Sequence, residues 1–231
     1  MILLDFLRAL GQLGDRAFLL VLAKALALTV ALLVALWIGA GWAIALLPDW
    51  SVELPLIGPA SFGLAAAGIA WLAVLAASAL LMFPVAAIFI GFFLEEIAGA
   101  VERRHYPHLP PVRPQPLIET LVDALQFFGV MVAANLLALV IYPFSGPFAP
   151  LVFWAVNGFL LGREYFQMVA LRRLPPDQAR ALRRRHFATI FTAGTLMALP
   201  LSVPLVNLIV PVLGVATFTH LFHRLSRGAP G

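Results

Sequence analysis

The hydrophobic residues of this chain fall into long uninterrupted runs. Residues 25–47 carry no charge over 23 positions, and a helix needs about 20 apolar residues to cross the hydrocarbon core of a bilayer. After a turn-rich loop over 48–59, residues 60–94 run uncharged for 35 positions. As a helix, that run would extend about 50 Å, so it must tilt, kink at Pro84 or project into water. The first half of the chain therefore predicts two long transmembrane helices.

The second half of the chain is also apolar, but prolines divide it into shorter segments. Residues 124–142 and 148–162 flank a proline-bounded turn over 143–147, which predicts a helical hairpin. Residues 187–199 would give about 20 Å of helix, too short to cross, before a second turn over 200–204. Both turns contain Pro-x-Ser-x-Pro, 57 positions apart, which is typical of a repeated unit. We expect two hairpins that penetrate the membrane partly, with tips covered by protein or facing a cavity.

These segments predict an all-α integral membrane protein built as a single membrane domain, residues 1–231. We assign the two long transmembrane helices to 1–104, the first helical hairpin to 114–173, and a basic helix with the second hairpin to 175–225. The composition also indicates a membrane protein, because 62% of the residues are hydrophobic and 11% are charged. In soluble domains about a quarter of the residues are charged. The first apolar run is too long for a cleaved signal, so we expect it to remain in the mature protein.

The basic residues predict the orientation in the membrane. All 15 lysines and arginines lie in residues 8–24, 103–113, 163–185 or 224–227, and the three loops between these regions hold none. By the positive-inside rule both termini are expected in the cytoplasm. The net charge of +4 comes from arginines beside apolar segments, where they set orientation and contact anionic lipid, so we expect no nucleic-acid partner.

One basic cluster surrounds a short helix that should begin at Pro175 or Pro176, with Asp177 in its first turn. Its six arginines are Arg172, Arg173, Arg180, Arg183, Arg184 and Arg185. A helix on the lipid surface is favoured over an anion-gathering one, because juxtamembrane arginines commonly bind lipid headgroups.

A candidate anion site lies just before the first membrane helix, at Gly14, Asp15 and Arg16. A helix start leaves free backbone N–H groups and a partial positive charge, and an arginine adds fixed donors, so a tetrahedral oxyanion can be held there. The alternative is a plain loop glycine followed by a topology anchor.

Polar residues in the hairpin segments are the candidates for a transport pathway. Asn157 is expected deep in the first hairpin, with Arg163 and Glu164 near its cytoplasmic end, and Asn135 lies on the preceding arm. Buried polar groups in membrane segments cost several kcal/mol unless they are paired or hydrated, which makes them functional candidates. The alternative is structural: hydrogen bonds between helices and ion pairing at the interface.

Catalytic and metal chemistry have little support in the sequence. Glu95 and Glu96 neighbour arginines where the long helix leaves the membrane, which favours ion pairing over acid/base work. His220 and His223 are one turn apart, but no carboxylate of matching spacing accompanies them. The chain has no cysteine, which excludes thiolate metal sites, and no nucleotide-binding or hydrolase motif. We expect no enzyme activity, no metal and no cofactor.

Four features occur together along the chain: the run from Asn157 to Phe166, the basic stretch to Arg185, the tip from Pro200 to Pro204, and the closing run from Pro211 to Thr217. In motif, order and tip placement, residues 10–225 resemble the CysZ family of bacterial sulfate permeases, within the wider etoposide-induced membrane protein family. The resemblance implies two long transmembrane helices, two partly penetrating hairpins and a homo-oligomer in the bacterial inner membrane.

The same resemblance implies a sulfate site. A glycine followed by a short arginine-containing stretch before the first membrane helix is associated with sulfate binding in that family, and Gly14 and Arg16 match it. The chain departs from the fuller pattern at Asp15, where an apolar residue is usual, and at Ala17, where a second arginine is common. An acidic neighbour opposes an anion electrostatically.

The hypothesis that joins these observations is a passive sulfate permease or channel that supplies cysteine biosynthesis and binds sulfate or a related oxyanion. The first alternative is a membrane scaffold or interaction protein of the same fold that transports nothing. The second is an enzyme acting on lipid, with Glu95, Glu96 and His105 as its acid/base set.

Overall fold

The fold comes from a computed structural model that describes residues 2–46, 51–54, 58–61, 63–203, 206 and 208–227. Helices dominate this part of the chain, which confirms the all-α class. The chain forms two compact units: one is Leu22–Gly91, and the other joins Met1–Val21 to Phe92–Gly231. Its organisation as a single membrane domain stays a prediction.

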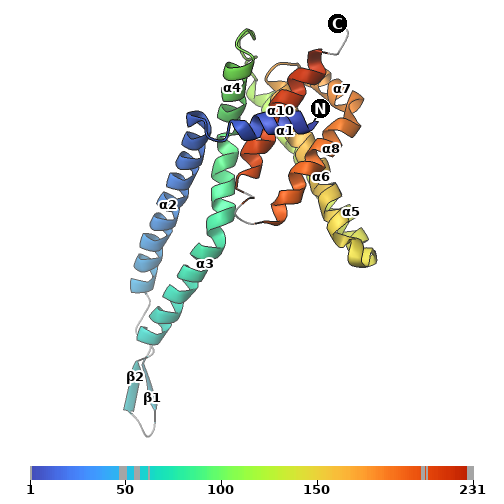
Figure 1. The fold of residues 1–231 in the computed structure, drawn as a ribbon. Helices are drawn as coiled ribbons and strands as arrows, with labels where there is room; N and C mark the ends of the chain where they lie inside the picture. The colour runs from blue at the N-terminus through green and yellow to red at the C-terminus, as the bar shows by residue number, and fades with distance from the viewer. Residues whose placement is uncertain are drawn as a thin grey trace. The chain divides into compact units, whose positions relative to one another are not determined.

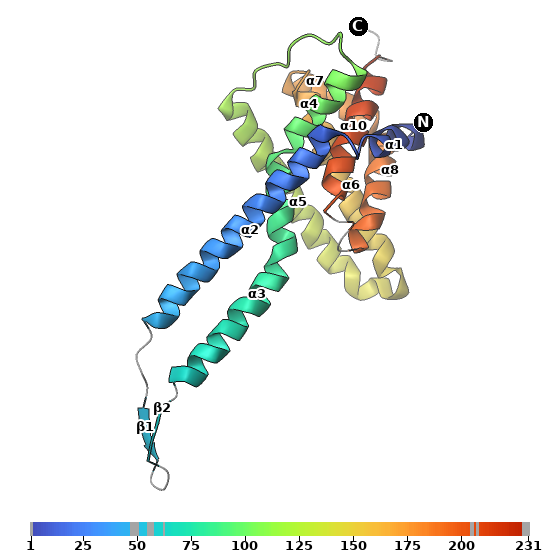
Figure 2. The ribbon, with the colours of Figure 1, turned by 60° about the vertical axis from the view of Figure 1, so that its left-hand side comes forward.

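The Leu22–Gly91 unit is a pair of long antiparallel helices. Helix α2 (Arg16–Ala45) and helix α3 (Gly63–Phe92) lie side by side (Figures 1 and 2). The loop between them contains a short antiparallel hairpin of β1 (Ser51–Leu54) and β2 (Gly58–Ser61), where the sequence predicted only turns. The helices are joined by the Trp37 indole, which donates to the Ser78 hydroxyl at 2.8 Å and meets the Trp71 ring edge-on with centroids 6.0 Å apart. Pro48 and Asp49 of this loop lie outside the described residues.

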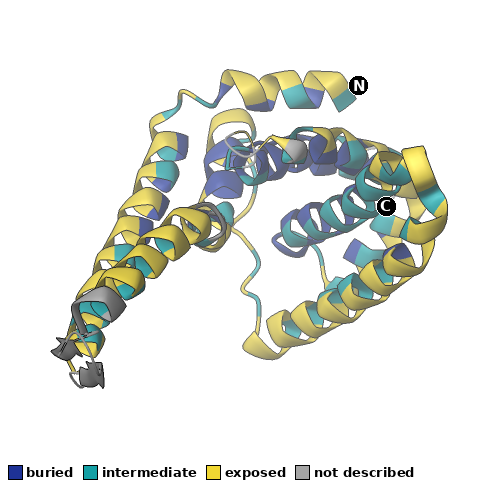
Figure 3. Cartoon of the chain, turned by 90° about the horizontal axis from the view of Figure 1, so that it is seen from below, coloured by how far each residue is buried: buried dark blue, intermediate teal, exposed yellow. Residues whose placement is uncertain are grey.

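The lengths of these helices suit a membrane. At about 1.5 Å per residue, each 30-residue helix extends about 45 Å. Within the described residues, the apolar helical runs Arg16–Ala45 and Leu117–Leu171 are long enough to cross a bilayer, and α3 is apolar over Ala67–Met82. Helix α2 starts nine residues before the uncharged run at 25, because a charge such as Lys24 ends an apolar run but does not break a hydrogen-bonded helix. Figure 3 shows how much of the long helices is exposed, as lipid-facing surfaces require.

The second unit contains the remaining elements. They are α1 (Ile2–Gly11), α4 (Leu94–His105), α5 (Leu117–Ser145), η1 (Gly146–Phe148), α6 (Ala149–Leu171), α7 (Pro176–Arg185), α8 (Phe187–Ala198), η2 (Leu199–Ser202) and α10 (Val210–Arg227). Helix α10 is at the centre and packs against α1, α4 and α6. Phe218 and Leu221 of α10 are fully buried, and Phe222 meets Phe166 of α6 edge-on. Nearly all of α10 is therefore core.

The two predicted hairpins are present as helix pairs. Helices α5 and α6 reverse direction at Gly146, whose φ of +48° is a conformation that glycine adopts without strain. Helix α5 is longer than the apolar segment 124–142, because Glu119 and Asp123 interrupt the hydrophobic run without interrupting the helix, and Pro143 is accommodated near its end. In the second pair α8 has 12 residues, or about 18 Å, so α8 alone cannot cross a bilayer. Pro204 of that tip lies outside the described residues.

Three glycines bring the two hairpins together. A methyl group on Gly194 of α8 would lie 2.0 Å from the Gly158 carbonyl oxygen and 2.8 Å from the Gly162 Cα on α6. One on Gly158 would strike Thr195 at 2.4 Å. Such small residues spaced four apart let helix backbones approach closely in membranes. Gly158 and Gly162, which belong to the most polar stretch of the sequence, therefore form a helix contact.

Candidate functional site

The start of α2 is formed by a tight turn after α1. The Asp15 N–H donates to the Gln12 carbonyl at 2.8 Å, and the Asp15 carbonyl accepts the Leu19 N–H at 3.0 Å, which begins the helix at Arg16. Gly14 is exposed within this turn, with open space where a side chain would stand. The first-turn N–H groups of α2 follow directly, and such groups lack acceptors within their own helix.

The acidic residue in this turn is already paired. Asp15 forms an ion pair with Arg104 of α4 and accepts a hydrogen bond from the Gln12 amide at 2.9 Å. The hydrogen bond from Arg104 lowers the pKa of Asp15, so its carboxylate is ionised and its charge is compensated. Arg16 is exposed and forms no ion pair with any described residue. The electrostatic repulsion expected between Asp15 and an anion is thus reduced. Arg16 remains as the uncompensated positive charge of the turn.

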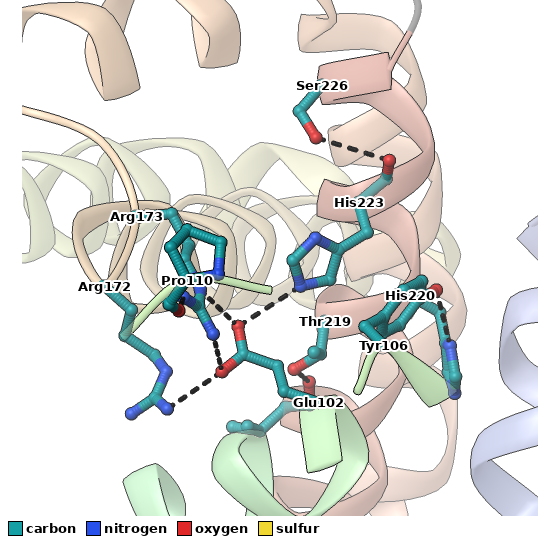
Figure 4. A network of polar contacts seen from close by, with 10 residues as sticks. Glu102, Tyr106, Pro110, Arg172, Arg173, Thr219, His220, His223 and Ser226 are labelled. Carbon is teal, nitrogen blue, oxygen red and sulfur yellow. Dashed lines mark hydrogen bonds and ion pairs between the residues drawn. The ribbon is translucent and has the colours of Figure 1, made fainter. Parts of the chain in front are cut away.

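A buried ionic network holds α4, α6 and α10 together (Figure 4). Both Glu102 oxygens accept from Arg173, at 2.9 Å from Nε and 2.8 Å from Nη2. Arg172 donates to Glu102 Oε2 at 3.0 Å, and His223 Nε2 lies 3.2 Å from Oε1. Arg173 also donates to the Pro110 carbonyl. One carboxylate therefore joins residues from three separate parts of the chain.

Burial makes this network structurally important. The side chains of Glu102, Arg172 and His223 are 5%, 8% and 6% exposed. Burial alone would raise the pKa of Glu102, but hydrogen bonds from His223, Arg173 and Arg172 outweigh it and hold that pKa well below its ordinary value. No sequence pattern predicted this network. The available signal was that Glu102 follows Ala98 by one helical turn on the buried face of α4.

The hairpin candidates do not converge on one polar site. The Asn135 amide donates to the Met131 carbonyl of its own helix at 2.8 Å and is exposed. The Asn157 amide likewise donates to its own helix, to the Phe153 carbonyl at 2.9 Å. Each of these bonds uses one of the two protons of its amide group and stays within a single helix.

Arg163 and Glu164 are neighbours on α6 with different surroundings. The Arg163 guanidinium is buried and lies over the Phe127 ring of α5, 5.5 Å from its centroid, and no ion pair joins it to Glu164 among the described residues. One Glu164 oxygen is buried without a hydrogen-bond partner. Arg163 lines a cavity of about 250 Å³ together with Arg183 and Arg184 of α7. The structure thus brings Arg163 beside other cations.

Most of the chain matches one known protein family. Residues 5–211 match the family described as sulfate transporter CysZ/etoposide-induced protein 2.4. The chain belongs to this family. No curated protein matches the sequence.

Membership in the CysZ family agrees with the apolar helices: this is a membrane protein of a transporter family. The Asn157–Phe166 run and the tips that carried the resemblance lie inside the matched region. Among the described residues no group of three histidine, cysteine or acidic side chains could hold a metal ion.

Proposed function

We propose that this chain is a passive sulfate permease of the bacterial inner membrane, which supplies sulfate for cysteine biosynthesis. Its family is described by sulfate transport. The segregation of all 15 basic residues supports an orientation with both termini in the cytoplasm. Partly penetrating hairpins would leave irregular backbone in the membrane, which supports a homo-oligomer that covers their tips.

The observation that carries the proposal is the ion pair between Asp15 and Arg104. It compensates the one acidic residue that opposes an anion at the start of α2. Arg16 keeps its charge free beside the first-turn N–H groups, and Gly14 leaves the turn open. A tetrahedral dianion fits this combination of backbone donors and a guanidinium.

The hairpins provide the second part of the proposed pathway. Arg163, Arg183 and Arg184 line one cavity, and three guanidinium groups around one cavity attract an anion. Asn157 and Asn135 keep one amide proton each for a passing anion. Glu164, whose Oε2 is buried without a hydrogen-bond partner among the described residues, lies beside this group as a further polar residue of the proposed pathway.

Flux measurements test the proposal directly. Purified protein in proteoliposomes should take up radiolabelled sulfate down its gradient, and unlabelled sulfite and thiosulfate should reveal how selective the site is. Liposomes without protein and liposomes with the Arg16→Ala variant serve as references. No sulfate uptake above the protein-free level would reject transport and leave the alternative of a non-transporting scaffold of the same fold.

Calorimetric titration with sulfate tests Arg16 itself. Arg16→Ala should weaken sulfate binding about ten- to a hundredfold, the value of one charge-assisted hydrogen bond. Arg16→Lys should recover part of this loss, because an ammonium group lacks the planar fork. Arg185→Ala, which removes an exposed arginine of α7, is the matched control. Equal affinities for Arg16→Ala and the control would remove Arg16 from the site.

A further inference from the structure

A second cationic cavity lies within the Met1–Val21 and Phe92–Gly231 unit, lined by residues of α1, α4 and α10. Its volume is about 460 Å³, and its walls carry three arginines, three histidines and Tyr106. Arg16 is not among the lining residues. None of these groups has a role in the proposed sulfate site.

The cavity wall contains a buried histidine with one unpaired ring nitrogen. His220 is 1% exposed, and its Nδ1 lies 3.0 Å from the Tyr106 hydroxyl. We assign the Tyr106 hydroxyl as the donor to Nδ1. In this assignment Nε2 of His220 carries the ring hydrogen, and it has no hydrogen-bond partner among the described residues. An unpaired buried donor costs about 1 to 3 kcal/mol, which a bound acceptor would recover.

The charges around the cavity favour an anion as that acceptor. Arg224 is paired with Asp5 of α1 through contacts of 2.6 and 3.0 Å. Arg8 and Arg227 are exposed, and neither forms an ion pair with a described carboxylate. Arg227 is held over the Tyr106 ring, 5.4 Å from its centroid. Three guanidinium groups therefore face one carboxylate, and two positive charges remain uncompensated.

The His105 ring leaves the charge balance of the cavity unchanged. His105 meets His220 edge-on, with ring centroids 4.8 Å apart. Burial, together with Arg104 and Arg8, lowers the pKa of His105, so its imidazole is neutral at neutral pH. The nearest buried acid, Glu102, is already bound by two arginines and His223. The cavity therefore presents arginines and a neutral N–H donor.

The size of the cavity and its surroundings narrow the ligand class. Water occupies about 30 Å³ per molecule, so 460 Å³ holds far more than a bare tetrahedral ion. Helix α1 turns Asp5 and Ala9 inward and leaves Leu3, Leu4 and Leu7 at least half exposed. An apolar surface thus lies on the same short helix as Arg8, the pattern that a helix at a lipid surface shows.

We propose that this cavity binds a phosphate group that carries an organic substituent, from either a soluble phosphate monoester or an anionic lipid headgroup. Arg8, Arg227 and the His220 N–H would share its oxygens. Because the site is separate from Arg16, loss of this binding would leave sulfate binding at the start of α2 intact.

The test uses the full-length chain in phosphatidylcholine nanodiscs. Glycerol 3-phosphate is titrated calorimetrically to probe a soluble ester, and phosphatidylglycerol is added to the discs to probe a headgroup through the rise in melting temperature. Arg8→Gln and Arg227→Gln should each weaken ester binding about tenfold or more, or abolish most of the lipid-induced rise. His220→Phe, which keeps the ring volume and removes the donor, should act in the same direction. Arg185→Gln is the charge-matched control.

Each arm gives a decisive result. Arginine-dependent binding of glycerol 3-phosphate supports a soluble ligand, and arginine-dependent stabilisation by phosphatidylglycerol alone supports a lipid. The proposal is overturned if neither probe acts on the wild type. It is equally overturned if Arg185→Gln loses as much as the two cavity variants, because the effect would then be general surface charge.

Discussion

The Glu102→Gln variant gives the sharpest test of how the second unit is held together. Glutamine keeps the size of the side chain but replaces one carboxylate oxygen by an NH₂ group and removes the charge. Whichever oxygen becomes nitrogen, Arg173 would then face a donor where it now finds an acceptor, because Arg173 donates to both oxygens. Both Arg172 and Arg173 would lose their counter-ion.

The expected magnitude follows from the contacts that are lost. Each Glu102 oxygen accepts two hydrogen bonds, so one oxygen replaced by nitrogen removes two. Charge-assisted hydrogen bonds contribute about 1.5 to 3 kcal/mol each, and breaking a buried ion pair costs about 3 to 5 kcal/mol. With about 2 to 4 °C of melting temperature per kcal/mol for a chain of this size, Glu102→Gln should melt about 6 to 20 °C below the wild type.

Thermal unfolding in a mild detergent, followed by tryptophan fluorescence, measures this difference. Asp177→Asn is the matched control, because Asp177 is 92% exposed in its ion pair with Arg180 and an exposed pair contributes about 0 to 1 kcal/mol. The control should melt within a few degrees of the wild type. If Glu102→Gln melts no lower than Asp177→Asn, the network does not stabilise the fold.

The pH dependence of this difference has a definite sign. The folded-state pKa of Glu102 lies below its ordinary value of 4.5, so its contribution to the free energy of unfolding is fully present above that value. It is lost as pH falls further, through the folded-state pKa. The gap in melting temperature between wild type and Glu102→Gln should stay constant from neutral pH to about 5 and narrow below about 4.5. A gap that widens in acid would contradict this assignment.

Three other substitutions test the anion site, the glycine contact and the membrane topology. Asp15→Ala should tighten sulfate binding in calorimetric titration, because it removes a negative charge and frees Arg104; unchanged affinity would count against a site there. Gly194→Ala should lower the melting temperature by several degrees because its methyl group would strike α6, whereas Gly129→Ala, with open space around it, should not. Ser51→Cys, in a chain without native cysteine, should react with an impermeant thiol reagent only from outside intact cells; labelling from the cytoplasmic side alone would reverse the proposed topology.

Several properties of this protein could be predicted from the sequence because they depend on neighbouring residues. Run length and hydrophobicity predicted α2 and α3, and proline and glycine marked the reversal at Gly146. The start of α7 at Pro176, with Asp177 in its first turn, was also predicted correctly. The ends of α5 were not predicted correctly, because a charge such as Glu119 ends an apolar run but does not end a helix.

The candidate site depended on contacts that no local pattern contains. In the sequence, Asp15 is an acidic residue that would repel an anion. In the folded chain it pairs with Arg104, which lies 89 positions away. Glu102 finds Arg172 at a separation of 70 residues and His223 at 121. A buried charge is stable only with its partners in place, and only tertiary packing brings those partners together. Local patterns in the chain were therefore enough to predict the membrane class, the hairpins and their turns. Which charges are compensated, and which remain free to hold an anion, depends on contacts that form only in the folded protein.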